Sequence, residues 1–321
     1  MERYVLPEGD LAVSRVAYGC MGLAAWNSKA VTEDERHRVR NIVRVAYEAG
    51  INLFDHADIY AYGKSEAAFA AAWDVIPRDE IVLQSKCGII LEGDPRYSGP
   101  ARYDFSYDHI IQSVQGSLQR LGTEYLDVLL LHRPDPLVEP EEVARAFDEL
   151  LHRGQVRHFG VSNHNIWQME LLRSYIDPPL VVNQLELSLL HPYLISEGIL
   201  ANQEAGSQAL ATGILDYCRL HHVLIQAWSP VAGGRVFSGS DEETQQGRAL
   251  ITLVEALARK KDTTVEAIAL GWLLRHPAGI QPILGTTRPE RVLASVQADT
   301  VQLSSEEWYA LLAAVRDAPV P

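Results

Sequence analysis

Cysteine is scarce in this chain, and its placement excludes a disulfide-stabilised fold. Only three cysteines occur among 321 residues, at Cys20, Cys87 and Cys218, far apart and without a C-x-x-C pair. An odd number of separated thiols fits a reducing compartment better than an oxidising one. The sequence therefore predicts a cytoplasmic protein.

Basic residues and long apolar runs are also few. The 28 Lys and Arg residues are outnumbered by 42 Asp and Glu residues, which gives a net charge of -14. Nucleic acids and anionic membranes attract basic surfaces, so neither is expected as a partner. No run reaches membrane-spanning length, and the first residues lack the apolar stretch of a signal peptide. With 47% apolar residues, the chain can bury a large core.

What the chain does contain is an alternation of strand-like and helix-like segments. The strands are short and apolar, and are predicted at 16–19, 51–55, 81–86, 126–132, 156–162, 180–186, 223–228 and 281–284. Helices are predicted at 32–50, 65–73, 107–121, 141–153, 166–175, 207–220, 248–260 and 265–275, with two more from Pro289 and Ser305. A hairpin around a turn at Pro7–Asp10 precedes them. Such alternation implies a parallel sheet.

Two parallel architectures compete, a doubly wound sheet and a closed (β/α)8 barrel. The doubly wound sheet predicts a Gly-x-Gly-x-x-Gly after an early strand, and the chain has none. Eight strand–helix units without an interior linker favour the barrel. The prediction is a single domain over residues 1–321, an α/β TIM barrel with an N-terminal β-hairpin and extra C-terminal helices.

The stretch Asn52–Glu66 is the first candidate site. Asp55 ends an apolar strand, and Tyr60 follows five residues later in a polar loop. A carboxylate and a phenol at this spacing can converge on one small cleft. The alternative is structural, with Asp55 capping a turn and Tyr60 on the surface.

In a barrel, functional side chains gather where the strands end. The ends of the eight strands carry Cys20-Met21, Asp55, Lys86, His132, Ser162-Asn163, Gln184 to Glu186, Trp228-Ser229 and Gly285 to Arg288. A lysine at the end of a buried strand is unfavourable unless paired, and Asp55 on the adjacent strand is its natural partner. A plain ion pair without catalytic use is the alternative.

These residues resemble the aldo-keto reductase superfamily. The likeness extends over essentially the whole chain. It rests on Gly63-x-Ser65-Glu66 and on the runs Asp55-His-Ala-Asp-Ile-Tyr60, Ser85-Lys-Cys-Gly88 and Leu131-His-Arg-Pro-Asp-Pro136. The sequences of these runs most resemble the bacterial YdhF-like branch of oxidoreductases. The resemblance implies a catalytic tetrad at Asp55, Tyr60, Lys86 and His132.

Carbonyl reduction needs a hydride for carbon and a proton for oxygen, and these four residue types suit the second task. A free tyrosine has a pKa near 10 and exchanges its proton slowly at neutral pH. An ammonium about 4 Å away contributes roughly 4 kcal/mol at an effective dielectric near 20, before the cost of desolvation is subtracted, so Lys86 is expected to lower the pKa of Tyr60. Asp55 keeps Lys86 charged, and His132 orients the carbonyl oxygen.

The resemblance also implies a nicotinamide cofactor held without a Rossmann loop. It assigns the nicotinamide amide to Ser162, Asn163 and Gln184. Trp228 would stack on the ring, at a position where many relatives carry tyrosine. Filling the barrel mouth is the structural alternative for Trp228. Cys20, Met21 and Asp55, at the ends of the first two strands, complete this part of the predicted cofactor site.

Two later segments are predicted to hold the cofactor phosphates. After the seventh strand, Ser229, Val231, Gly233, Gly234 and Arg235 form a glycine turn that a pyrophosphate can approach. After the eighth, Thr286 and Thr287 precede a helix, and Thr287 with Glu290 is expected to form a capping box. Arg288 and Arg291 add charge for a 2′-phosphate, which favours NADPH (NADP+) over NADH. A solvated basic pair is the alternative.

Substrate contacts are expected from Trp26 and Arg133, under loops at 23–30, 89–107 and 188–208. The leading interpretation is an NADPH-dependent oxidoreductase that reduces aldehyde and ketone carbonyls to alcohols by hydride transfer, with Tyr60 as the general acid. A second is an NADPH-binding sensor or partner subunit of low turnover. A third is a metal-dependent hydrolase using His56, Asp58, His132 and Glu186. It ranks last because His-x-His and His-Glu-x-x-His spacings are missing, and no metal is expected.

Overall fold

Eight parallel strands close into a barrel, as the alternation predicts. The computed structural model describes residues 1–6, 11–27, 29–199, 213–237 and 245–316. Around the barrel the strands follow the order β10-β11-β12-β3-β4-β5-β8-β9. Their bounds are β3 (Ala17–Gly19), β4 (Leu53–Asp55), β5 (Val82–Cys87), β8 (Leu126–Leu131), β9 (Val156–Ser162), β10 (Leu180–Glu186), β11 (Leu224–Trp228) and β12 (Gln281–Leu284). The doubly wound alternative is wrong.

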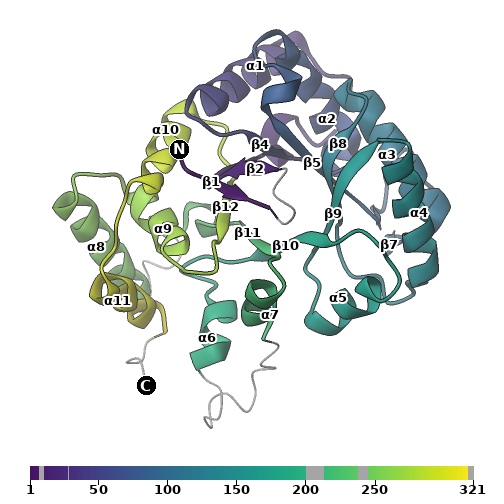
Figure 1. Cartoon of the computed structure of the whole chain (residues 1–321). Coiled ribbons are helices and arrows are strands. Elements are labelled where there is room, and N and C mark those ends of the chain that lie inside the picture. Colours follow the sequence, from purple (N-terminus) through teal and green to yellow (C-terminus); the bar gives the residue numbers. More distant parts are fainter. Residues whose placement is uncertain (7–10, 28, 200–212, 238–244, 317–321) are drawn as a thin grey trace.

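Helices surround this barrel (Figure 1). They are α1 (Glu33–Glu48), α2 (Lys64–Phe69), α3 (Tyr107–Leu121), α4 (Pro140–His152), α5 (Ile166–Arg173), α6 (Tyr193–Ile199), α7 (Ile214–Leu220), α8 (Gln245–Lys260), α9 (Val265–Leu274), α10 (Pro289–Val296) and α11 (Ser305–Arg316). The capping box at Thr32 and Glu35 starts α1, and Val39, Ile42 and Val43 form its buried face, as predicted. None of the helices in the described ranges is long and apolar enough to cross a membrane.

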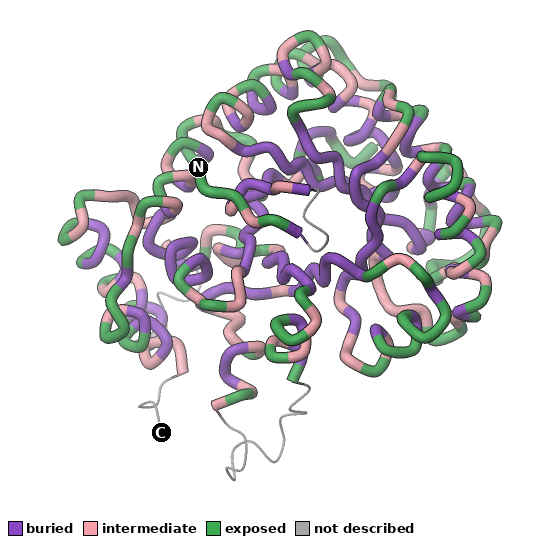
Figure 2. Tube along the Cα trace, in the orientation of Figure 1, coloured by how far each residue is buried: buried purple, intermediate pink, exposed green. Residues whose placement is uncertain are grey.

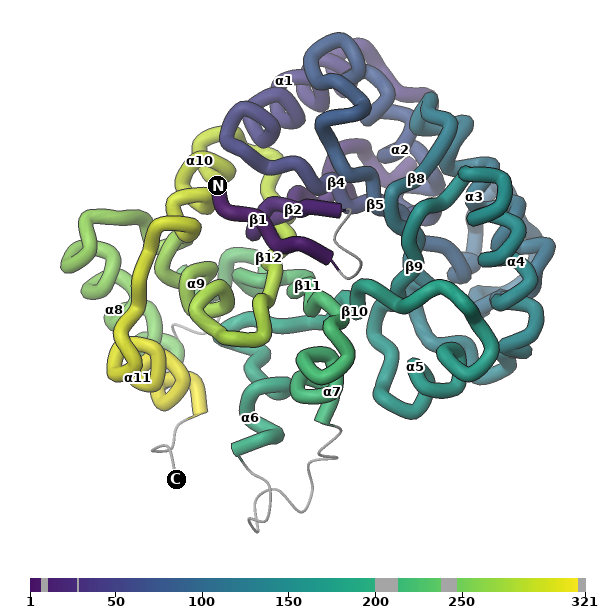
Figure 3. The backbone as a smooth tube through the Cα atoms, in the orientation of Figure 1, coloured from purple at the N-terminus to yellow at the C-terminus, as the bar shows by residue number. Residues whose placement is uncertain are grey.

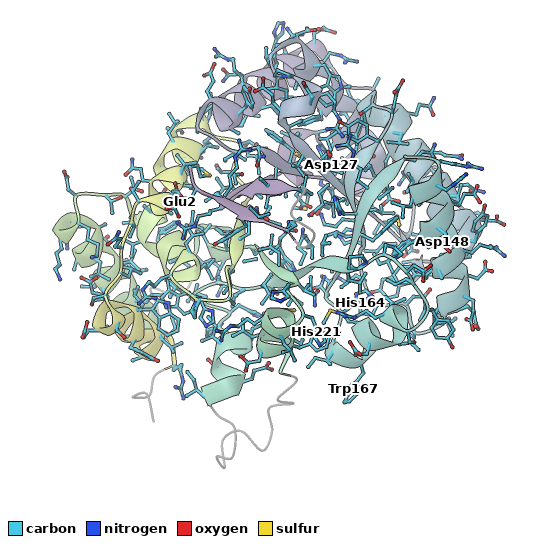
Figure 4. The ribbon with its side chains drawn as sticks, viewed as in Figure 1. Glu2, Asp127, Asp148, His164, Trp167 and His221 are labelled. Atoms are coloured by element: carbon cyan, nitrogen blue, oxygen red, sulfur yellow. The ribbon has the colours of Figure 1, made fainter. Side chains whose placement is uncertain are left out.

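Apolar residues fill two separate regions. The larger lies between the strands and the helices, where the barrel-facing sides of the helices are buried and their outer sides exposed (Figure 2). Trp167, for example, extends outward from α5 and is 80% exposed (Figure 4). The smaller region includes Leu53, Val82, Val128 and Val182 and packs against the N-terminal hairpin. It fills one end of the barrel.

The hairpin closes that end. Strands β1 (Arg3–Val5) and β2 (Ala12–Ser14) pair antiparallel and lie across the barrel opening (Figure 3). Leu6, Leu11 and Val13 contribute to the smaller apolar region, and the backbone N–H of Ser14 donates to Asn52 Oδ1 at 2.6 Å. The hairpin prediction is confirmed, but its turn at Pro7–Asp10 lies outside the described residues. The carboxyl ends of the strands lie at the opposite end.

Some predicted boundaries differ from the structure. The α-helix predicted at 65–73 ends at Phe69 and continues as a 3-10 helix, η3 (Ala70–Asp74), a common way for a helix to finish. Of the helix predicted at 207–220, residues 207–212 lie outside the described residues and the rest forms α7. The loop at 89–107 contains a short antiparallel pair, β6 (Ile89–Ile90) and β7 (Arg102–Tyr103).

Candidate active site

The loop after β4 carries Tyr60 into the barrel mouth. Tyr60 begins a short 3-10 segment, η2 (Tyr60–Gly63), in which Ala61, Tyr62 and Gly63 all have positive φ. Left-handed backbone is unfavourable for alanine and tyrosine, so the surrounding packing must hold the turn. Gly63 is required here, because a Cβ at this position would lie 2.7 Å from the Arg120 side chain. The local conformation fixes the direction of Tyr60.

Lys86 is the centre of the polar cluster. Its side chain is fully buried, and its Nζ donates to Asp55 Oδ2 at 2.8 Å, to the His56 backbone oxygen at 2.7 Å and to the Tyr60 hydroxyl oxygen at 3.0 Å. These three bonds use all the donors of the ammonium group. Since the Tyr60 oxygen accepts from Lys86, the proton of the phenol remains free for another acceptor. The pairing of Asp55 with Lys86 is as expected.

The pKa values of this cluster follow burial and charge. Burial lowers the pKa of Lys86, but Asp55 and Tyr60 outweigh it and the net pKa is raised. Burial raises the pKa of Tyr60, and Lys86 opposes this without reversing it. Lys86 thus lowers the pKa of Tyr60, as expected, but the net pKa still lies above its usual value, because desolvation of the phenolate is the larger effect. Tyr60 is a protonated phenol at neutral pH.

His132 faces Tyr60 from the end of β8. The two rings are 6.0 Å apart between centroids and nearly perpendicular, at 81°. Burial lowers the pKa of His132, and the positive charges of Lys86 and Arg133 lower it further. The pKa therefore lies well below its usual value, and the imidazole is neutral. Its Nδ1 has no hydrogen-bond partner among the described residues. A neutral ring beside the phenol can donate one N–H bond to an oxygen held between them.

The predicted nicotinamide residues are brought together only in part. Asn163 Nδ2 donates to Ser162 Oγ at 2.7 Å, and Trp228 Nε1 donates to Asn163 Oδ1 at 3.1 Å. The guanidinium of Arg133 lies 5.7 Å from the Trp228 ring centroid. Gln184 lies deeper, where its amide nitrogen donates to Asp55 Oδ1 at 3.1 Å.

The other predicted residues of the first strand's end differ in exposure. Cys20 is completely buried, and its thiol contacts the Tyr18 backbone oxygen at 3.8 Å. Met21 and Trp26 are 54% and 50% exposed, and Trp26 meets the ring of Tyr62 edge-on at 5.7 Å. Met21 and Trp26 are therefore accessible to ligands, whereas the Cys20 side chain is not.

The two predicted phosphate segments lie next to each other. Gly233 and Gly234 have φ of 69° and 94°, and a Cβ on Gly234 would lie 4.0 Å from Arg291. No atom lies within 4 Å of a Cβ placed on Gly233, which leaves its backbone approachable. Around them, Val231 is partly buried, and several other predicted residues are exposed, namely Ser229, Arg235, Thr287, Arg288 and Arg291. Neither Arg288 nor Arg291 forms an ion pair with another described residue.

The capping box expected at Thr287 and Glu290 is wrong. The N-cap of α10 is Arg288, with Pro289 at the first helical position and no side-chain cap. Proline at that position holds the preceding residue in extended backbone, so the helix begins one residue later than the box requires. Thr286 Oγ1 accepts from the Arg288 backbone N–H at 3.2 Å instead.

Sequence reasoning missed three glutamines inside the barrel. Gln84, Gln226 and Gln281 are completely buried, and Gln84 Nε2 donates to Asp55 Oδ1 at 2.6 Å. The available signal was a glutamine among apolar residues in β11 and in β12, and a glutamine beside Ser85 and Lys86 in β5. A buried amide must be hydrogen-bonded, so such positions predict an internal network.

The residues of the metal-hydrolase alternative do not form a metal site. Within the described ranges, no group of three His, Cys, Asp or Glu side chains is arranged to bind a metal. His56 is completely buried against Phe69, and burial lowers its pKa to about 3. Asp58 is also buried, and both its oxygens are without hydrogen-bond partners among the described residues.

The closed barrel, with an ionisable cluster at the carboxyl ends of its strands, has the layout of (β/α)8-barrel enzymes. Comparison with known proteins identifies the class. The model described as the aldo/keto reductase family matches residues 17–316, so the chain belongs to that family of oxidoreductases.

Individual relatives agree with this assignment. The chain is 37% identical to the uncharacterized oxidoreductase YcsN of Bacillus subtilis, over 100% of both chains. It is 33% identical to the oxidoreductase YdhF of Escherichia coli, covering 99% of this chain and 98% of that protein. The structure of an aldo/keto reductase from Klebsiella pneumoniae in complex with NADP and acetate is similar, with a TM-score of 0.73 at 25% identity over 100% and 96% of the chains. The expected likeness to the YdhF-like branch is confirmed.

Proposed function

We propose that this protein reduces aldehyde and ketone carbonyls to alcohols with NADPH, and that Tyr60 is the general acid. One observation carries the proposal. The Tyr60 hydroxyl accepts from Lys86, which is held by Asp55, while the neutral ring of His132 stands beside the phenol. A proton donor and an N–H donor thus converge on one point, where a carbonyl oxygen can lie.

The chain's residues have distinct tasks in this reaction. When bound, NADPH supplies the hydride that forms the new C–H bond at the carbonyl carbon. His132 donates a hydrogen bond that orients the carbonyl oxygen. Tyr60 transfers its proton to that oxygen, and the positive charge of Lys86 stabilises the phenolate left behind. The phenolate then regains a proton from solvent, so one carbonyl, one NADPH and one proton give one alcohol and one NADP+.

The residues at the mouth fit a dinucleotide phosphate. The open backbone at Gly233 offers a close approach for a pyrophosphate, and the neighbouring Arg291 contributes positive charge. Arg288 and Arg291 are exposed arginines without carboxylate partners in the described ranges, and bidentate guanidinium groups suit a 2′-phosphate. These features support NADPH rather than NADH. Ser162, Asn163 and Trp228 would contact the nicotinamide, and Trp26 and Arg133 the substrate.

The test is Tyr60→Phe, followed by NADPH oxidation across a panel of small aldehydes and ketones. We expect kcat to fall by roughly 10²-fold or more, because general acid catalysis contributes about that much, while the NADPH Kd changes little. Tyr175→Phe is a matched control, since Tyr175 is 45% exposed and lies just before the start of β10, whereas the site lies where the strands end. A fully active Tyr60→Phe enzyme would refute the assignment. Tight NADPH binding by the unmodified protein without turnover on any carbonyl would favour the sensor instead.

A further inference from the structure

Amide side chains, rather than apolar ones, fill the barrel directly beneath Asp55. Gln84, Gln184 and Gln226 are 0%, 3% and 0% exposed, and we call these three residues the glutamine cluster. They come from three strands of the barrel wall, β5, β10 and β11. Burying three amides is unfavourable unless each donor and acceptor is satisfied. The hydrogen bonds of this cluster therefore indicate what it does.

The cluster joins opposite walls of the barrel. In the closed order, β4 and β10 are four strands apart, and so are β5 and β11. Across the first pair, Gln184 Nε2 donates to Asp55 Oδ1 at 3.1 Å. Across the second, Gln84 and Gln226 exchange two bonds, of 2.7 and 3.1 Å. Two diametric contacts thus cross at the level of Asp55.

Every bond in the cluster has a defined direction. Gln226 accepts from Gln84 and Gln184 and donates to Gln84 and Gln281, so its amide has all four of its bonds. This arrangement leaves the Gln84 and Gln184 nitrogens pointing at Asp55 Oδ1, at 2.6 and 3.1 Å. Oδ1 therefore accepts two N–H bonds, while Oδ2 accepts from Lys86 at 2.8 Å. Asp55 meets only donors, as a carboxylate requires.

We propose that Gln84 and Gln226 are positioning residues for the reaction. Gln84 fixes one oxygen of Asp55, Gln226 fixes Gln84 and Gln184, and the other oxygen of Asp55 is thereby aimed at Lys86. This inference rests on the proposed function, since it assigns a task to Asp55. Gln281 lies outside the positioning set, because it reaches Asp55 only through Gln226 and another glutamine, and donates to the Ser14 backbone oxygen in the hairpin.

The test is Gln84→Met, which keeps the length of the side chain and removes its donors. Loss of alignment in a catalytic group lowers turnover with little effect on binding. We expect kcat to fall about tenfold, while the substrate KM and the NADPH Kd stay within about twofold. The kcat values are normalised to active sites by titration with NADPH, so that partial misfolding does not count as lost turnover.

The pH profile of alcohol oxidation supplies a readout that a merely structural residue would not change. Asp55 raises the pKa of both Tyr60 and Lys86. A displaced Asp55 should therefore shift the basic limb of the profile to lower pH in Gln84→Met. The other titratable groups that act on Tyr60 or Lys86 are unchanged in the variant, namely Cys20, His56 and His132.

Two further variants make the test decisive. Gln226→Met leaves the Gln84 contact with Asp55 in place and should lower kcat about threefold, so it decides the question if Gln84→Met does not fold. Gln281→Met is the matched control, with equal burial and chemistry, and should lower the urea midpoint without changing kcat.

The inference would be overturned if Gln84→Met had a kcat within twofold of the unmodified enzyme and a pH profile that superimposes on it. If only Gln226→Met folds, the same result in that variant would overturn the inference. If the unmodified protein reduces carbonyls and Tyr60→Phe does not, that result leaves the proposed function intact. If the unmodified protein reduces none, the proposed function fails first.

Discussion

The two ends of the barrel interior have opposite chemistry. At the hairpin end, Leu53, Val128 and Val182 pack with apolar residues of the hairpin. At the other end, Asp55, Lys86 and the glutamine cluster are equally buried but are joined by hydrogen bonds. Apolar burial stabilises the fold without directional demands, whereas buried charge is tolerated only with fixed partners. Stability and chemistry are therefore separated along the barrel axis.

The largest effect is expected from Leu53→Ala, which acts on the apolar end. Leu53 is completely buried, so the substitution should lower the free energy of unfolding by about 2 to 5 kcal/mol. The value of kcat per folded molecule should be unchanged, since the catalytic end is not touched. Urea unfolding and steady-state kinetics measure the two quantities, and Leu220→Ala, at a 74% exposed position, is the control. A large fall in kcat would break the separation of the two ends.

Asp58→Asn tests whether the buried carboxyl of Asp58, at the polar end of the barrel, lowers the free energy of unfolding. Burial and the nearby charge of Glu66 raise the pKa of Asp58 to about 7. Arg96 and Arg120 lower this pKa, but by less. The folded protein therefore holds this proton more tightly than the unfolded chain, whose carboxyl has a pKa near 4. Stability should be lost as the pH rises from about 4 through about 7, by roughly 2 to 3 kcal/mol between pH 5 and pH 8.

The asparagine variant lacks this titration. Its free energy of unfolding, measured in urea at pH 5 and pH 8, should fall less on going to the higher pH than that of the unmodified protein. Buried histidines that also titrate contribute equally to both proteins and cancel in the difference. Asp148→Asn is the control, because Asp148 lies exposed on α4 (Figure 4). Parallel pH dependence in all three proteins would contradict the prediction.

The smallest effect concerns Arg133 at the mouth. Its guanidinium lies over Trp228 and forms no ion pair with another described residue, so it can meet an anionic group on the substrate. Arg133→Gln should lower kcat/KM about tenfold for 4-oxobutanoate and leave that for butanal nearly unchanged. Arg38→Gln, on the exposed face of α1, is the control. Equal losses on both aldehydes would show that Arg133 acts on something other than the carboxylate.

Periodic patterns predicted the fold because each acts over a short stretch. The strands at 156–162, 180–186 and 281–284 and the helix at 107–121 have the predicted bounds. The capping box of α1 was readable for the same reason, since Thr32 and Glu35 are three residues apart. The box at Thr287 failed because Pro289 changes the local backbone, which overrides the pattern of side chains.

The residues of the candidate site could be predicted from their positions at strand ends and from the family resemblance. Asp55, Tyr60, Lys86 and His132 do converge. The direction of the net pKa shift of Tyr60 was not predictable, because it depends on how far the phenol is buried. Nor was the glutamine cluster, since its bonds join residues up to 142 positions apart.

The alternation of strands and helices, the polar strand ends and the negative net charge depend on residue type and local spacing, so they could be read from the sequence. The contacts between amides and the carboxylate across the barrel, and the pKa shifts that burial causes in Tyr60, His132 and Asp58, became visible only in the folded structure. Hydrogen-bond direction and desolvation depend on distances between residues far apart in the chain, and closure of the barrel sets those distances.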